Sequence, residues 1–266
     1  MVLSLETVSY RYAGSRTPSL VEVSLSLGGG EVVGLVGANE AGKSTTCLVA
    51  AGLAPRAIGG ALSGRVAVDG QLLGDLPPGE LAGVVGIAFA TPQLSGMCST
   101  VYEEVAFGPM NLGLPRNEVM ERTARALRAV AISDLAARDP EHLSGGQRQL
   151  VVIAGILAME PRHLVLDEPT AHLDPVGTRL VGEAVTRLAK AGASILIAEQ
   201  KTDLLAAICG RVVALDRGRL ALEGPAESVL GDPLLEGLAV DPPTSVRLRR
   251  LAVAAGVDPG QLEMAT

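Results

Sequence analysis

Hydrophobic and polar residues alternate in the first part of the chain and later gather in short continuous apolar runs. Residues 2–36 contain alternating runs separated by glycine-rich breaks, which predicts a meander of short antiparallel strands. Residues 64–69 predict one more strand. The continuous runs have the length of strands buried on both faces. They are residues 31–36, 84–89, 164–167, 194–198 and 211–216.

Between these runs, apolar residues recur at helical spacing. Residues 44–53, 148–160 and 175–191 each predict a helix, and residues 100–139 predict a helical insert. Helices that alternate with strands indicate an α/β fold with a parallel sheet. After Pro225, Asp-Pro pairs divide the chain into short helices. We therefore expect one main domain, residues 1–225, with a helical insert at about 95–145, and a small C-terminal helical appendage, residues 226–266.

Composition excludes several classes of protein. The chain has 266 residues, of which 48% are hydrophobic, so it can bury a core. Its net charge of −7 argues against a nucleic-acid groove, which needs concentrated Lys and Arg. Three scattered cysteines predict reduced thiols rather than a disulfide framework. The longest apolar runs fall short of the roughly 20 residues that a membrane span requires, and the N-terminus has no signal-peptide pattern. Any work at a membrane would need a partner.

The segment Gly37–Thr45 lies between a predicted strand and a predicted helix. Gly37, Gly42, Lys43 and Ser44 occupy the fixed positions of the pattern G-x-x-x-x-G-K-[ST]. Glycines let the backbone N–H groups turn toward a polyphosphate, and the helix N-terminus favours its negative charge. Lys43 would contact the outer phosphates, and the Ser44 hydroxyl could ligate Mg²⁺. The alternative is an ordinary glycine-rich turn with a solvated lysine.

An acidic pair follows the apolar run 164–166. Ligands of α/β proteins bind at the carboxyl ends of the strands, where Asp167 and Glu168 stand. Asp167 could hold Mg²⁺, and Glu168 could position or deprotonate an attacking water. A capping acid pair before a turn is the alternative.

A second candidate anion site is Ser144-Gly145-Gly146-Gln147, at the start of a predicted helix. By itself, this segment could equally be an N-cap followed by a turn. Because the helix would carry it away from the sheet edge, we expect the two anion sites not to meet within one molecule. A head-to-tail dimer would instead set each Ser144 segment over the partner's Lys43 loop, so that nucleotide binding closes the dimer and hydrolysis reopens it.

Residues 37–45, 143–149 and 164–174 closely resemble the nucleotide-binding subunits of ATP-binding cassette (ABC) transporters. The resemblance implies a P-loop NTPase fold with a RecA-like parallel-sheet core, an N-terminal antiparallel β subdomain and an inserted α-helical subdomain. It also implies an ATPase that binds ATP and Mg²⁺. Carried over to this sequence, Tyr12 stacks on adenine, and Asp174 lies in the loop that crosses the dimer interface. The phosphate contacts include Asn39 and Thr45.

Residues 100–114 resemble the corresponding segment of energy-coupling factor (ECF) ATPases, which power importers of vitamins and of cobalt or nickel ions. The resemblance implies a peripheral protein at the cytoplasmic face of the membrane. Its partners would be a second ATPase subunit, identical or paralogous, and integral membrane coupling and substrate-binding subunits, with no nucleic acid. Apolar residues of the insert would form the docking groove, unless they only pack the insert's own core. A soluble ABC ATPase unconnected with transport, and a regulatory ATP-binding subunit with slow hydrolysis, remain alternatives.

Three positions depart from the family pattern. Glu40 stands where the phosphate loop usually has glycine, and its carboxylate would repel phosphate if it faced the nucleotide. The glutamine expected after the strand at 84–89, a Mg²⁺ and coupling residue, has Gln93 as its nearest candidate. Gln200 occupies the position of the switch histidine that contacts the γ-phosphate. Since glutamine cannot carry a proton charge, we expect slowed hydrolysis at this site.

Overall fold

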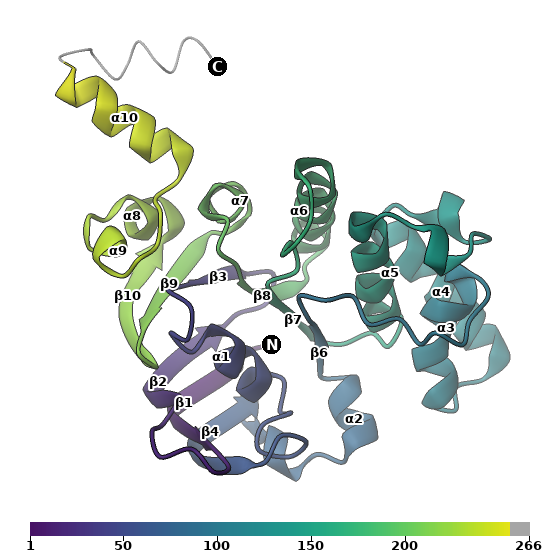
Figure 1. Cartoon of the computed structure of the whole chain (residues 1–266). Coiled ribbons are helices and arrows are strands. Elements are labelled where there is room, and N and C mark those ends of the chain that lie inside the picture. The colour runs from purple at the N-terminus through teal and green to yellow at the C-terminus, as the bar shows by residue number, and fades with distance from the viewer. Residues whose placement is uncertain (256–266) are drawn as a thin grey trace.

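The structure is a computed structural model of the whole chain, and it describes residues 1–255. A six-stranded sheet forms its centre, in the order β10-β9-β3-β8-β7-β6 (Figure 1). The strands from β9 to β6 run parallel, and β10 pairs with β9 antiparallel. Their bounds are β3 Val32–Val36, β6 Val85–Ala88, β7 His163–Asp167, β8 Ser194–Ala198, β9 Arg211–Asp216 and β10 Arg219–Pro225. All five predicted runs are therefore strands of one sheet.

A smaller antiparallel sheet, in the order β2-β1-β4-β5, packs beside it (Figure 1). Its strands are β1 Leu3–Tyr12, β2 Leu20–Leu27, β4 Gly60–Val68 and β5 Gln71–Leu72. The expected meander over residues 2–36 is thus confirmed for β1 and β2 but wrong for β3. Every residue of β3 is apolar or glycine and buried, whereas β2 alternates buried and accessible positions. A strand without a polar face belongs in the middle of a covered parallel sheet.

Two cores cover the two faces of the central sheet. Val33 and Leu35 of β3 point into the core shared with the antiparallel sheet and α1 (Lys43–Ala50). Val32 and Val36 point into the other core, which the helices α5, α6 and α7 line. Those helices are Gly145–Leu157, Pro175–Lys190 and Thr202–Ile208. The connection from β5 to β6 contains the short turn η1 (Leu73–Asp75) and helix α2 (Pro78–Ala82).

The predicted helical insert consists of two helices, α3 (Val101–Asn111) and α4 (Arg116–Ala129), which pack against α5 (Figure 1). A capping box between Thr100 and Glu103 starts α3. The break before α4 contains Gly113, with φ +71°, and Pro115. Two short turns, η2 (Ser133–Leu135) and η3 (Pro140–His142), lead on to α5. The exact domain boundaries, 95–145 included, stay a prediction.

The short helices expected after residue 225 are confirmed as far as residue 254. They are α8 (Ala226–Gly231), α9 (Leu234–Gly237) and α10 (Thr244–Ala254). Helix α8 packs against β9 and β10, while α10 projects away from the main body (Figure 1). The remainder of the predicted appendage, residues 256–266, lies outside the described residues.

Candidate functional site

The phosphate-loop motif connects β3 to α1, as its pattern predicts. Gly37 has φ +151° and Gly42 has φ +107°. A Cβ atom added at Gly37 would lie 2.5 Å from the carbonyl oxygen of Leu215, so there is no room for a side chain. The β9–β10 turn holds the loop in place, because the backbone N–H of Gly218 donates to the Ala41 carbonyl at 2.9 Å.

Lys43 lies inside this loop and is only 5% exposed. Its ammonium donates to the carbonyl oxygens of Gly37, at 2.9 Å, and Ala38, at 3.0 Å. The same nitrogen lies 3.7 Å from Oε1 of Glu168. The solvated-lysine alternative is therefore wrong: the loop backbone encloses the cation and one carboxylate faces it.

The acidic pair stands at the end of β7, on the same sheet edge as the phosphate loop. The Ser44 hydroxyl donates to Oδ1 of Asp167 at 3.0 Å. Asp167 is buried, and this burial, with a smaller contribution from the charge of Glu168, raises the pKa of its carboxyl group. Glu168 adopts φ +49°, an uncommon backbone conformation for a residue with a side chain. Such a conformation persists only where the surroundings enforce it.

Gln200 follows β8 and joins the same cluster. Its Nε2 donates to Oε1 of Glu168 at 3.0 Å and to Oδ1 of Asn39 at 3.1 Å. The structure thus brings Gln200, Glu168, Asn39 and Lys43 together from three separate segments of the chain. Such a cluster of opposite charges and amide groups is suited to bind the outer phosphates of a nucleotide and orient a water molecule.

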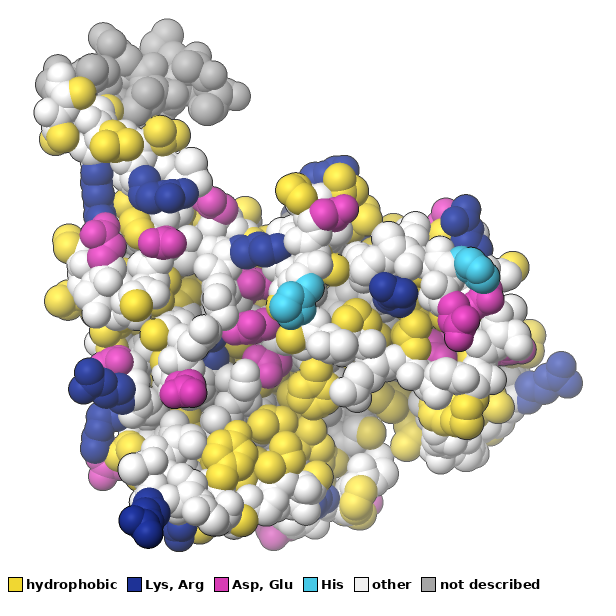
Figure 2. Space-filling model, viewed as in Figure 1, with side chains coloured by type: hydrophobic (Ala, Val, Ile, Leu, Met, Phe, Trp, Pro, Cys, Tyr) yellow, Lys and Arg dark blue, Asp and Glu magenta, His cyan; other side chains and the backbone are white. Residues whose placement is uncertain are grey.

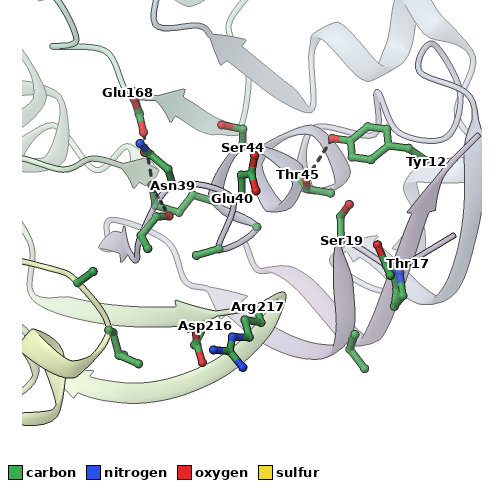
Figure 3. A pocket seen from close by; sticks show the side chains of 18 of the residues that line it. Tyr12, Thr17, Ser19, Asn39, Glu40, Ser44, Thr45, Glu168, Asp216 and Arg217 are labelled. Carbon is green, nitrogen blue, oxygen red and sulfur yellow. Dashed lines mark hydrogen bonds and ion pairs between the residues drawn. The ribbon is translucent and has the colours of Figure 1, made fainter. Parts of the chain in front are cut away.

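Tyr12 lies at the other end of the site. Its hydroxyl and that of Thr45 are 3.1 Å apart, and Figure 3 shows this hydrogen bond across the pocket from Glu168. The pocket has a volume of about 970 Å³ and contains Glu40 and Ser44 between these two ends. A long pocket with an aromatic ring at one end and an anion-binding loop in the middle is suited to a nucleotide.

Sequence reasoning missed part of the pocket wall. Asp216, the last residue of β9, and Arg217, in the turn to β10, line it on one side (Figure 3). They could have been found, because β9 is parallel to β3 and its carboxyl end must reach the same edge of the sheet. Leu238 and Ala239 of the appendage also line the pocket, and no local sequence signal marks them.

Two predicted groups lie elsewhere. Ser144, Gly145, Gly146 and Gln147 are not among the residues described as lining the pocket. The side chains of Ser144 and Gln147 form a reciprocal capping box at the start of α5, with bonds of 3.0 and 3.3 Å. Gln93 is exposed and borders a different pocket, between β6 and helices α3 and α5.

Glu40 is exposed and adopts φ +65°, in the left-handed region that usually selects glycine. The family's glycine at this position thus has a conformational reason, and here a glutamate accepts the strain. Its side chain borders the pocket near Ser44 (Figure 3).

Among residues 1–255, no group of three or more His, Cys, Asp or Glu side chains could hold a metal ion. In the same part of the chain, every helix is too short or too polar to cross a bilayer. Figure 2 shows Lys and Arg scattered among acidic and neutral side chains on the face drawn, with no continuous basic stripe.

Comparison with known proteins gives consistent matches. The ABC transporter family model matches residues 20–171. The energy-coupling factor transporter ATP-binding protein EcfA of Methanosarcina acetivorans is 39% identical to this chain, over 93% of the chain and 88% of that protein. Among solved structures, CbiO1 of Clostridium perfringens, part of the ABC transporter complex CbiONQ, has a TM-score of 0.79 and 31% identity, covering 96% of this chain and 98% of that one.

A more distant structure has the same fold. It is a dimeric ATP-binding cassette in a post-hydrolysis state, bound to ADP and Pi, with a TM-score of 0.71 and 24% identity over 84% of this chain and 98% of that one. The predicted P-loop NTPase fold, with its parallel core and antiparallel β subdomain, is confirmed. The chain belongs to the ABC transporter family, in which it is an ATP-binding subunit and an ABC-type ATPase.

Proposed function

We propose that this chain powers an ECF-type importer of a micronutrient, a vitamin or a transition-metal ion, by nucleotide-driven closure of a head-to-tail dimer. The observation that carries the proposal is the cluster of Lys43, Glu168 and Gln200 at one sheet edge. The likeness to EcfA and CbiO1 supports the transport role.

In the proposed reaction, the phosphate loop binds the polyphosphate of ATP. Lys43 then exchanges its contact with Glu168 for the outer phosphates, since a phosphate carries more negative charge than one carboxylate. Glu168, released from the ammonium, orients and deprotonates the attacking water. Gln200 contacts the γ-phosphate side of the site through its amide N–H groups. Tyr12 stacks on adenine at the far end.

The residues present fit a Mg²⁺ ion. The Ser44 hydroxyl and the Asp167 carboxylate are hard oxygen donors, and they lie 3.0 Å apart beside the phosphate loop. When bound, the ion would neutralise charge that develops on the phosphate oxygens. Gln93 is the remaining candidate for this shell, and it would have to move from its exposed position to take part.

The second half of each site comes from another subunit in this proposal. Ser144 caps α5, and the first backbone N–H groups of this helix lie beside it, outside the pocket of its own chain. Helix N-termini bind anions, so this segment can close over the nucleotide of a partner. Asp174, which caps α6 through the N–H of Gly177 at 2.6 Å, stands in the loop that we expect at the same interface. The partner is a second copy or a paralogue.

A groove on the helical insert offers a docking surface for the membrane subunits. It lies between α3 and α4, has a volume of about 670 Å³ and is mostly apolar. Met110 and Met120 line it and are 61% and 52% exposed. Adaptable methionine side chains are typical of surfaces that receive partner helices. Docking here would hold the chain at the cytoplasmic face of the membrane as a peripheral protein. Not every apolar residue of the insert faces this groove: Val101 and Val105 are buried in the core that the insert shares with the central sheet.

Two measurements on the full-length chain test the proposal. The unaltered protein should hydrolyse MgATP, and the Glu168→Gln variant should not. The double variant M110E/M120E should retain this ATPase activity but no longer co-sediment with membranes that contain the partner subunits. Met97→Glu is the matched control, because Met97 is 74% exposed and lies outside the groove. Equal membrane binding by all variants, or equal turnover with and without Glu168, would contradict the proposal.

A regulatory subunit with slow hydrolysis is the second candidate, and Gln200 is the observation that favours it. A neutral amide at this position stabilises developing negative charge less than a protonated histidine would. Paired with a paralogue of full activity, the chain would then contribute one slow and one fast site. Turnover measured for the chain alone separates the two candidates.

A further inference from the structure

The residues on either side of Gln200 both reach across to the loop that follows Glu168. Glu199 is 2% exposed, and its Oε2 accepts bonds from the backbone N–H and the hydroxyl of Thr170. Its Oε1 accepts the backbone N–H of Gln200 at 2.8 Å. One buried carboxylate therefore joins the backbone of Gln200 to the segment two residues after Glu168.

Lys201 makes a second connection in the same direction. Its ammonium donates to the carbonyl oxygens of Thr170, at 2.9 Å, and Leu173, at 3.2 Å, and to the hydroxyl of Thr178 at 2.7 Å. An ammonium group has three N–H donors, and here each has an acceptor. Lys201 is also the N-cap residue of α7, but its ammonium has no acceptor to offer the free N–H groups of that helix.

The choice of lysine at this position is unusual for this chain. Only three lysines occur in the sequence, at 43, 190 and 201, and the other basic residues are arginines. A compact ammonium can donate in three directions to a curved set of acceptors, whereas a planar guanidinium cannot. Lys43 and Lys201 are both enclosed by backbone carbonyls, and Lys190 is exposed at the end of α6.

The loop held in this way also packs on the start of α5. A Cβ atom added at Gly145 would lie 3.1 Å from Cδ2 of Leu173, and one at Gly146 would lie 2.7 Å from Cα of Gly177. The segment 170–177 therefore lies between Gln200 and the Ser144–Gln147 segment of the same chain. A shift of this segment would change both the direction of Glu168 and the surface that the chain presents to a partner.

We propose that Glu199 and Lys201, together the brace, are positioning residues that fix Gln200 and Glu168 in one geometry and so set the turnover rate without contributing to nucleotide binding. Neither side chain lines the nucleotide pocket. Each acts through the loop 168–173, to which Glu168 belongs. The inference rests on the proposed roles of Glu168 and Gln200 in ATP hydrolysis.

The test compares lysine variants of the full-length protein. Lys201→Met keeps the length and apolar stem of the side chain and removes its three donors. Lys190→Met is the matched control at the exposed lysine. For each protein we would measure kcat for MgATP, the affinity for the non-hydrolysable analogue AMP-PNP by calorimetry, and the melting temperature. Glu199→Gln examines the other half of the brace.

We expect kcat to fall at least tenfold in Lys201→Met, with AMP-PNP affinity within twofold of the unaltered protein and Lys190→Met unchanged. Lys201→Arg keeps the charge but donates only within the plane of its guanidinium, so it should recover only part of the lost rate. A kcat within twofold of the unaltered protein would overturn the brace, as would a parallel loss of kcat, affinity and melting temperature. If Lys201→Met does not fold, Glu199→Gln decides by the same criteria. If the unaltered chain hydrolyses no ATP, the proposed function fails and the brace's role fails with it.

Discussion

Replacing Gln200 by histidine should accelerate ATP hydrolysis. In the structure, the uncharged Gln200 amide donates hydrogen bonds to the Glu168 carboxylate, at 3.0 Å, and to Asn39, at 3.1 Å. A hydrogen bond that involves one charged group contributes about 1.5–3 kcal/mol, and a donor that is itself charged moves the contribution toward the upper end of this range. A protonated imidazole at this position should therefore stabilise the transition state by about 1 kcal/mol more, which corresponds to roughly a fivefold higher rate.

The assay is the initial rate of ATP hydrolysis at saturating MgATP, measured from pH 6 to pH 8.5. The Gln200→His variant should be faster at the acidic end and lose the gain as the imidazole deprotonates above its usual pKa of about 6.5. Gln200→Asn, which keeps an amide but shortens its reach, should gain nothing. A rise of less than about twofold at pH 6, or a gain that does not depend on pH, would refute the reasoning.

Three further predictions concern other parts of the fold. Gly37→Ala should lower the free energy of unfolding by about 1–3 kcal/mol, measured by thermal melting, because its Cβ would overlap the Leu215 carbonyl. Gly74→Ala, with nothing within 4 Å of the added Cβ, should not. Burial lowers the pKa of His163. Below about pH 6.5 the unfolded chain therefore binds a proton at this histidine more readily than the folded chain does, so the free energy of unfolding should decrease as the pH is lowered. In urea titrations at pH 7.5 and 5.5, His163→Val should lessen this fall, whereas the exposed control His172→Asn should not. Tyr12→Ala should weaken ATP binding by about 5- to 150-fold in calorimetry, from about 1–3 kcal/mol of stacking, and Tyr12→Phe should change it little.

Much of the fold follows from the sequence because its buried strands are unambiguous. The runs at 194–198 and 211–216 contain no alternation, and both match their strands residue for residue. Local patterns could not show which sheet a strand joins. Residues 32–36 follow two antiparallel strands along the chain, yet pair with β8 and β9, and only the burial of both their faces explains this.

The residues of the site likewise fall into those that the sequence could locate and those that it could not. The phosphate loop and the acidic pair carry their chemistry within a few consecutive residues, so the motif alone located them. The place of Arg217 in the pocket wall depends on which strand lies beside β3. The brace depends on contacts between residues that are about 30 positions apart in the sequence. Such features follow from tertiary packing, which no pattern in a single segment records. The sequence marks the Ser144 segment as a candidate anion site, and within its own chain Ser144 is the N-cap residue of α5.

The central claim is that two chains bind each nucleotide jointly, through the Lys43 loop of one and the Ser144 segment of the other. The most direct measurement is the mass of the Glu168→Gln protein in solution by light scattering, with and without MgATP, alone and with its co-purified partner subunits. The account predicts a dimer only when ATP is bound, and a monomer when Ser144→Arg is added to block the anion site. The account would be contradicted if the Glu168→Gln protein, with Ser144 unaltered, stayed monomeric in MgATP both alone and with its partner subunits.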